Sequence, residues 1–447
     1  MSADAEQDYF CDGIAEEIIS ALTRVKSLHI VARTSAFAFK GERLDVRDIG
    51  SKLNVKHILE GSVRKAGRRL RITVQLISVS DGYHLWSERF DRDLDDVFAI
   101  QDEISLAIVD KLKIALIGNE REALVKRPTD RIDVYNLYLL GRYHWNRFTQ
   151  EDASKCQECF ERALSLDPTY APAHAGMAML YLQMSAGGVH VMPASVAVPN
   201  VRAAAGKALA ADPANGEAHR ALAVCAVFHE RDWSAALLHC KRAFELEPNV
   251  AMNHEAYAFY LSAAGRLEEA LSEIARAVEL DPVSPLILEN AAWHFYLAKD
   301  FEKARDYCER SLALNPDFGW THVISGLLHC HGGRLDDAIS EFEKAGVPIM
   351  ADAYLGFACG VSGRHERARE VIRNLEKRRS RGSVSAYYFA LVHLGLGEND
   401  QALTWLEAAE EERPAETVLT AWLKPDPIWD PLRHDPRFQD LVRRMNF

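Results

Sequence analysis

Two hydrophobic periods organise the first part of the chain. Between residues 12 and 24 the apolar positions recur at helical spacing, and Asp12 stands where an N-cap belongs. Between residues 69 and 78 apolar and polar positions alternate, which is the period of a half-buried strand. The sequence therefore predicts a helix that is followed, further along, by a sheet.

Turns at Ala66-Gly67 and Asp81-Gly82 indicate that this sheet is a β-meander. Its three strands are expected over residues 57–65, 69–78 and 83–90. The other elements expected here are a short buried strand over residues 28–32 and helices over 46–53 and 94–116. Helices and strands interleaved in this way predict a small α+β domain over residues 1–118.

Further along, the pattern becomes a repeat. An Asp-Pro pair or its equivalent closes one Ala-rich helical stretch after another, at Leu166-Asp167-Pro168, Ala211-Asp212-Pro213, Leu246-Glu247-Pro248, Leu280-Asp281-Pro282 and Leu314-Asn315-Pro316. The last four prolines are 35, 34 and 34 residues apart. Because proline cannot continue a helix, each one ends a helix at the same place in a repeated unit.

A second register gives the same period. Alanines follow one another at intervals of 34, 34, 34, 30 and 34 residues, at Ala236, Ala270, Ala304, Ala338, Ala368 and Ala402. Twelve positions before them stand Val224, Ala258, Ala292, Gly326, Gly356 and Ala390, nearly all of them small. Five positions before them stand Gly265, Gly333, Gly363 and Gly397, with Arg231 and Lys299 at the other two places.

These two registers have one structural explanation. Small residues let two helices cross closely, and glycine suits the left-handed position that ends a helix. Two helices, a glycine-containing turn and a proline in 34 residues are typical of the tetratricopeptide repeat (TPR). The predicted fold is therefore mainly α, a right-handed TPR α-solenoid of about eight helix-turn-helix repeats preceded by the small α+β domain.

The register also divides the chain. We expect a linker over residues 119–133, the TPR array over 134–416 and a C-terminal capping segment over 417–447, because an array needs its terminal apolar face covered. The second unit is long, and its excess around Gly187-Gly188 predicts a loop between its helices.

Composition narrows the class of protein. Of the 447 residues, 48% are hydrophobic and 26% are charged, which is typical of a globular chain. The net charge of −12 argues against direct binding of nucleic acid, since an acidic chain gains nothing from counterion release. There is no apolar run of about 18 residues and no secretory leader, so we expect no membrane span and a cytoplasmic location. The eight scattered cysteines are expected to be reduced core thiols.

Several segments carry a resemblance to a known family. Residues 8–19, Asp8-Tyr9-Phe10-Cys11-Asp12-Gly13-Ile14-Ala15-Glu16-Glu17-Ile18-Ile19, resemble the opening of the TolB-like N-terminal domain that precedes TPR arrays in bacterial signalling proteins. Matching segments follow over residues 30–35, 59–64 and 85–91, and the stretch from Trp429 to Phe438 resembles the ends of those proteins. The resemblance covers nearly the whole chain.

The resemblance implies a regulatory role. That family usually carries a class III adenylate/guanylate cyclase domain or a winged-helix DNA-binding domain in front, and this sequence contains neither. It also lacks the apolar first strand that normally precedes Asp8. The sheet in residues 1–118 is therefore expected to have one unpaired edge, which could mediate docking.

Candidate chemistry is weak throughout. A zinc site at Cys156-Gln157-Glu158-Cys159 would need a second such pair, so these cysteines are expected to be core residues. The residues of His329-Cys330-His331 point in different directions on a helix, and the basic run from Arg64 to Arg71 is expected to form a solvated hairpin tip. No motif of a nucleotide-binding loop, zinc protease or serine hydrolase is present. We therefore predict no catalytic residue, no metal and no cofactor.

Binding is expected on the concave surface of the array, which the first helix of each unit lines. The candidate residues are Phe228, Phe259, Glu289, Asn290, Trp293, Tyr296, Trp320 and Phe357. Such an aromatic-lined groove suits a protein or peptide partner with apolar anchors, although the same aromatics would also serve to pack one repeat on the next.

Three functional hypotheses remain open. The first is an adaptor or sensory module in bacterial signalling. The others are the regulatory portion of an adenylate/guanylate cyclase system and the effector-sensing half of a winged-helix transcription regulator. The sequence does not separate them.

Overall fold

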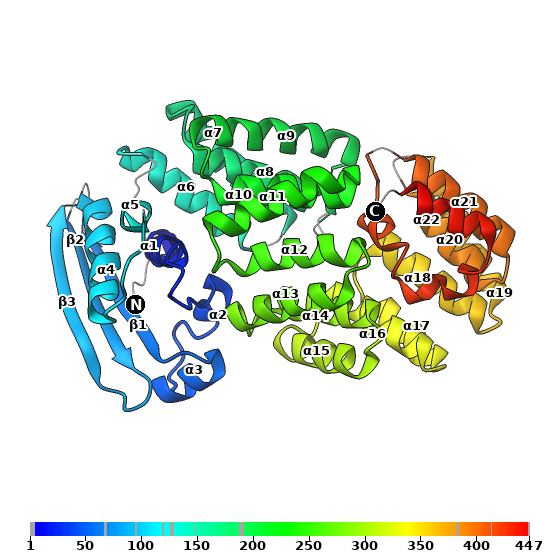
Figure 1. The fold of residues 1–447 in the computed structure, drawn as a ribbon, viewed down its shortest axis with the longest axis horizontal. Helices are drawn as coiled ribbons and strands as arrows, with labels where there is room; N and C mark the ends of the chain where they lie inside the picture. The colour runs from blue at the N-terminus through cyan, green and yellow to red at the C-terminus, as the bar shows by residue number, and fades with distance from the viewer. Residues whose placement is uncertain are drawn as a thin grey trace.

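The structure is a computed structural model that describes residues 5–66, 69–93, 96–118, 120–125, 129–147, 149–186, 192–380, 384–412 and 414–445. A small sheet with helices against it lies at one end of the molecule, and a long array of paired helices forms the rest (Figure 1). The predicted fold class is confirmed. No described helix is long and apolar enough to cross a membrane.

The sheet is the predicted meander. Strands β1 (His57–Ala66), β2 (Arg69–Ser78) and β3 (His84–Asp93) are antiparallel in the order β1-β2-β3. On β2 the apolar residues Leu70, Ile72 and Val74 are buried, because α1 (Ala5–Thr23) and α4 (Val97–Lys111) cover that face. Helix α3 (Val46–Leu53) spans the residues predicted for it. In the described chain β1 and β3 each pair with β2 alone, so the sheet has two unpaired edges rather than the expected one.

Two local predictions are wrong. Residues 28–32 do not form a strand; instead the Ala32 N–H donates to the Leu280 carbonyl oxygen at the end of a helix of the array (2.7 Å), immediately before α2 (Arg33–Phe37). Asp12 is no N-cap, because α1 begins at Ala5, and the Asp12 carboxylate forms an ion pair with Lys40 instead. Ala32 and Asp12 both contact residues that are distant in the sequence, and a local pattern does not reveal such contacts.

Within the residues that the structure describes, the array consists of eight consecutive helix pairs. They are α6 (Ile132–Trp145) with α7 (Gln150–Leu166), α8 (Ala171–Ala186) with α9 (Ala194–Ala211), α10 (Gly216–Cys225) with α11 (Trp233–Leu246), α12 (Ala251–Ala263) with α13 (Leu267–Leu280), α14 (Pro285–Leu297) with α15 (Phe301–Leu314), α16 (Gly319–His331) with α17 (Leu335–Lys344), α18 (Pro348–Val361) with α19 (His365–Arg379), and α20 (Ala386–Gly395) with α21 (Asn399–Glu411). A π-helical turn, η2 (Ala226–Glu230), extends α10. We call these pairs units one to eight. The loop expected around Gly187-Gly188 lies outside the described residues.

Both sequence registers have the structural roles expected of them. The six alanines of the second register are fully buried. The turn residues all have positive φ: 78° at Gly265, 72° at Gly333, 77° at Gly363 and 74° at Gly397, and also 52° at Arg231 and 61° at Lys299. The left-handed turn is therefore a property of the repeat itself, even where a side chain makes it less favourable.

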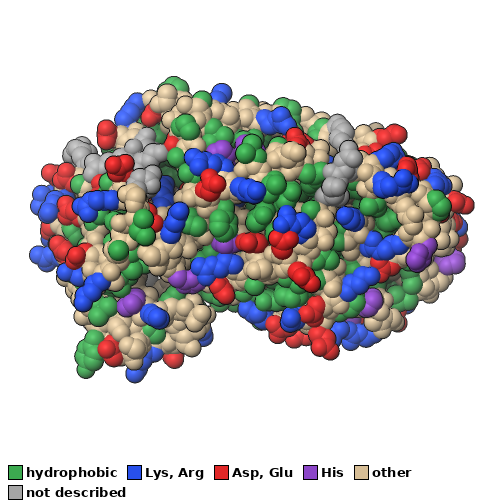
Figure 2. Space-filling model, in the orientation of Figure 1, with side chains coloured by type: hydrophobic (Ala, Val, Ile, Leu, Met, Phe, Trp, Pro, Cys, Tyr) green, Lys and Arg blue, Asp and Glu red, His purple; other side chains and the backbone are tan. Residues whose placement is uncertain are grey.

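The region between the sheet and the array is packed rather than extended. The predicted linker contains the short helix α5 (Glu120–Leu124), whose Leu124 is buried. One hydrophobic cluster runs from α1, α4 and the sheet through units one and two to α10 of unit three. A second runs through units three to eight and includes C-terminal residues such as Trp422 and Trp429. Acidic and basic side chains are interspersed over the face of the molecule in Figure 2.

The C-terminal residues do more than cap the last repeat. After α21 the chain forms two 3₁₀ turns, η3 (Val418–Trp422) and η4 (Pro427–Leu432), before α22 (Pro436–Arg444). Helix α22 packs on α21, with Arg437 bonded to Glu407 (2.9 Å). The Trp233 indole N–H donates to the Met445 carbonyl oxygen (2.8 Å), so the C-terminus returns to unit three, near the middle of the molecule (Figure 1).

Candidate functional site: a concave groove filled by the C-terminal segment

Residues 415–433, here called the C-terminal segment, lie along the first helices of units three to eight. The segment enters beside η2, where the Ala415 N–H donates to the His229 carbonyl oxygen (2.8 Å). The His229 ring Nδ1 lies 2.9 Å from the Ala415 carbonyl oxygen. The surface predicted to bind a partner is thus occupied by the chain itself.

Trp422 is the first anchor of the segment. Its ring centroid lies 5.6 Å from that of Phe228, 5.4 Å from that of Phe259 and 5.8 Å from that of Trp293. Its indole N–H donates to the Ser262 hydroxyl (2.8 Å), so both the apolar and the polar part of the side chain are satisfied. Three of the predicted groove residues, from units three, four and five, therefore converge on one tryptophan.

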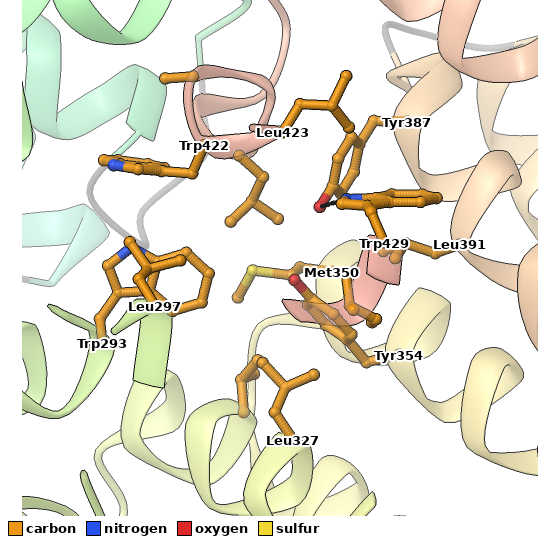
Figure 3. Packing of buried hydrophobic residues seen from close by; sticks show 14 of the residues in the cluster. Trp293, Leu297, Leu327, Met350, Tyr354, Tyr387, Leu391, Trp422, Leu423 and Trp429 are labelled. Carbon is orange, nitrogen blue, oxygen red and sulfur yellow. Dashed lines mark hydrogen bonds between the residues drawn. The ribbon is translucent and has the colours of Figure 1, made fainter. Parts of the chain in front are cut away.

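Trp429 is the second anchor. It is fully buried, with its ring edge-on to Tyr387 of α20 (5.4 Å) and its indole N–H donating to the Tyr387 hydroxyl (3.2 Å). Figure 3 shows Trp422 opposite Trp293 and Trp429 beside Tyr387, with Met350 lying between these two groups. The segment thus joins unit five to units seven and eight across the inside of the array.

A buried carboxyl lies between the two anchors. The Tyr296 hydroxyl donates to Asp426 Oδ1 (3.2 Å), and the Ile428 N–H donates to the same oxygen (3.0 Å). Burial raises the pKa of Asp426 to about 7, and the hydrogen bonds from Ile428 and Tyr296 only partly oppose this rise. Tyr296, a fourth predicted groove residue, is therefore a polar partner of the segment.

The turns of units three to five contact the C-terminal residues as well. Arg231 donates to the carbonyl oxygens of Glu410 (2.9 Å) and Glu412 (3.2 Å), and Lys299 forms an ion pair with Asp430 (2.6 Å). Gly265, at the corresponding turn of unit four, lies against the side chain of Lys424. The two turns that lack glycine are thus the two whose long basic side chains reach this part of the chain.

The remaining predicted residues have other surroundings. Trp320 lines a small recess with His229, Tyr388 and Thr417. Asn290 is hydrogen-bonded to Glu255 and buried, and Glu289 is buried with its pKa raised by desolvation. The backbone of Phe357 lies where α18 crosses Gly395 of α20. Four of the eight predicted residues therefore contact the segment directly, and Trp320 lies beside its Thr417.

The place of the segment is the feature that sequence reasoning did not predict, because residues 417–447 were expected to cap the last repeat. The segment carries two tryptophans in a stretch rich in proline, with no helical or strand period. Two large apolar side chains in such a stretch need a surface to cover them, and that signal was available before the structure.

A second set of polar contacts attaches the N-terminal region to the array. Arg142 of α6 donates to Glu16 of α1 (2.8 Å) and to Glu217 of α10 (2.9 Å). Asp281 accepts hydrogen bonds from the backbone N–H (3.0 Å) and the hydroxyl (2.6 Å) of Ser35. Units one, three and four therefore hold α1 and α2.

The residues considered for chemistry are placed as structural residues. Cys156 and Cys159 are buried in α7, and burial raises the pKa of the Cys156 thiol to about 12, which keeps it protonated. His331 ends α16. Within the described residues no three His, Cys, Asp or Glu side chains are grouped to hold a metal ion.

Comparisons with known proteins show which sequences this chain is similar to. The family model of the tetratricopeptide repeat matches residues 260–317 and 361–417. A putative adenylate cyclase 3 of Rhizobium meliloti is 41% identical over 182 residues, which are 41% of this chain and 31% of that protein. The transcriptional regulator HilA of Salmonella typhimurium is 23% identical over 242 residues, 53% of this chain and 42% of that protein. The chain thus spans less than half the length of either relative.

Matches among solved structures have low sequence identity and TM-scores below 0.5. PilW, a type IV pilus biogenesis factor, is 18% identical with a TM-score of 0.39, over 51% of this chain and 98% of that one. The human IFIT1 dimer with m7Gppp-AAAA is 14% identical with a TM-score of 0.47, over 91% of this chain and 94% of that one. Residues 260–317 and 361–417 thus match the tetratricopeptide repeat, and the helix pairs of the described chain form a TPR-like solenoid.

Proposed function

We propose that this protein is a protein–protein interaction module, an adaptor or sensory part of bacterial signalling, and that its concave TPR surface binds a segment of a partner. The observation that carries the proposal is the C-terminal segment. The groove holds an irregular stretch of chain by aromatic anchors and side-chain hydrogen bonds, which is how helical repeats bind peptides.

The residues proposed to bind the partner are those that contact the segment. Phe228, Phe259 and Trp293 form the aromatic site, and Tyr296 supplies the hydroxyl donor. Large aromatic residues in a water-free pocket contribute most of the energy of such interfaces.

The test uses the purified full chain as bait in an extract of its native cells. Phe259→Ala/Trp293→Ala alters the aromatic site, and Leu238→Ala alters a side chain on α11 that is 65% exposed. We expect a protein that wild type and Leu238→Ala retain and the double variant loses, with helical circular dichroism unchanged in all three. A captured protein that the double variant keeps equally well would refute the groove as the binding surface.

The regulatory portion of a cyclase system is the second candidate, and the 41% identity to a putative adenylate cyclase favours it. The match to HilA in turn favours the transcription-regulator hypothesis. Sequencing the DNA directly upstream separates these two hypotheses. A cyclase-coding segment in frame supports the cyclase hypothesis, and a winged-helix-coding segment supports the transcription-regulator hypothesis. Either result would assign the same binding surface to a longer signalling protein.

A further inference from the structure

We propose that the C-terminal segment is an intramolecular ligand of the groove, and that the groove selects partner segments of the same chemistry. That chemistry is two tryptophan anchors seven residues apart with a proline-flanked aspartate between them, as in Trp422, Asp426 and Trp429. The inference rests on the proposed function and names its ligand class.

The two anchors bind separate sites built by different units. Trp422 contacts rings from α12, α14 and η2, whereas Trp429 contacts Tyr387 of α20. Each indole N–H also has its own acceptor, Ser262 in the first site and Tyr387 in the second. A hydrocarbon side chain of similar size would leave both acceptors without a donor, so the groove favours tryptophan over leucine or phenylalanine.

The stretch between the anchors fixes their separation. Arg433 donates to the carbonyl oxygens of Lys424 and Asp426 (2.9 Å to the latter), and Asp426 accepts from the Ile428 N–H. Pro425 and Pro427 restrict the backbone on both sides of the aspartate. The turn is therefore ordered largely by its own contacts, so that it presents both tryptophans to the groove together.

The segment is held in the manner of a bound peptide. Among the described residues, one backbone-to-backbone hydrogen bond, from Ala415 to His229, joins it to the array. Its other contacts are made by side chains, and its two turns are 3₁₀ rather than part of a repeat. Because α21 is complete at Glu411, the repeats keep their own helical hydrogen bonds when the segment leaves.

Competition with a peptide tests the proposal directly. The probe is a fluorescein-labelled peptide of residues 414–434, added to the full chain and to its Trp422→Ala/Trp429→Ala variant, with fluorescence anisotropy as readout. We expect at least tenfold tighter binding to the variant, whose own segment has lost its anchors. Binding should disappear when the peptide lacks both tryptophans or when Trp293→Ala is added to the variant.

Equal binding to wild type and a folded variant, or no binding to either, would overturn the proposal. Hydrogen exchange of the unaltered chain covers the case in which the variant does not fold. We expect the amides of residues 418–432 to exchange at least tenfold faster than those of α14 and α20. If the amides of residues 418–432, α14 and α20 all exchanged in one cooperative step, the segment would be an inseparable part of the core, contrary to the proposal.

The alternative occupant of the groove is the C-terminal segment of a second copy of this chain. Sedimentation of the wild-type protein distinguishes the two occupants. A monomer supports the intramolecular ligand, whereas a dimer held by exchanged segments refutes it. The peptide experiment uses purified chain alone. Peptide binding without any captured cellular protein would therefore count against the proposed function and not against this inference.

Discussion

At the residue scale, glycines mark the places where helices touch. A Cβ on Gly360 of α18 would overlap the backbone of Gly395, whereas a Cβ on Gly206 of α9 would meet nothing within 4 Å. We expect Gly360→Ala to destabilise the protein by about 1–3 kcal/mol through overpacking. Gly206→Ala is the control, and it should stabilise by up to about 1 kcal/mol because alanine favours the helix. Urea denaturation of both variants checks the prediction, and equal midpoints would contradict it.

Arg231 and Lys299, the two left-handed turn residues of the register that are not glycine, give a matched pair of variants. Arg231→Gly relieves the positive φ but removes two partly buried, charge-assisted hydrogen bonds to carbonyl groups, so we expect a net destabilisation of about 1 kcal/mol. Lys299→Gly relieves the same strain and removes an ion pair that is largely exposed to solvent. It should leave the urea midpoint unchanged or raise it. A larger loss for Lys299→Gly than for Arg231→Gly would show that the turn contacts are assigned wrongly.

At the scale of elements, a charged contact positions the N-terminal helix. Arg142 lies between Glu16 of α1 and Glu217 of α10, with all three side chains mostly buried. Arg142→Gln removes the cation that Glu16 and Glu217 share, although Glu16 keeps Arg33 and Glu217 keeps Arg220. We therefore expect a loss of about 1.5–3 kcal/mol. Because the loss falls on the docking of α1, its amides should exchange hydrogen much faster than those of α14.

Arg131→Gln, in the turn before α6, is the control for that variant. Arg131 pairs with Asp133 and donates to the Leu166 carbonyl oxygen, both at the surface, so its replacement should cost at most about 1 kcal/mol and leave the exchange of α1 unchanged. If Arg142→Gln behaved like this control, the contact between α1 and the array would not depend on the buried charges.

The elements also show what a sequence pattern can predict. The repeat was predictable because each unit carries its own information: a small residue at the crossing, a glycine at the turn and a proline at the end. Residues 28–32 were not, because their backbone pairs with Leu280 of the array, far away in the sequence. The register proposed residues for the groove, but it did not predict their contact with Trp422, since no period connects Trp422 to unit four.

At the scale of the whole molecule, buried carboxyl groups couple stability to pH. Burial raises the pKa of Glu17 and of Asp426 to about 7 and that of Glu255 to about 8. In the unfolded chain these pKa values return to about 4, so the folded state binds more protons between about pH 4 and 7–8. The stabilisation is complete below the unfolded pKa and is lost as the pH rises through the folded pKa.

Histidines act in the opposite direction, but in a lower pH range, because desolvation lowers the pKa of His29, His219, His239, His294 and His329. Burial lowers the pKa of His294 to about 4, so it opposes the carboxyl groups only below about pH 6.5. Between pH 6.5 and 8 the carboxyl groups therefore decide the sign, and we expect the urea midpoint to fall across this interval. Glu255→Gln keeps the shape of the side chain and an acceptor for Asn290 but removes the titratable carboxyl group. The urea midpoint of this variant should therefore fall less steeply with pH than that of the wild type. A wild-type midpoint that stayed level or rose from pH 6.5 to 8 would mean that these carboxyl groups are charged in the folded protein.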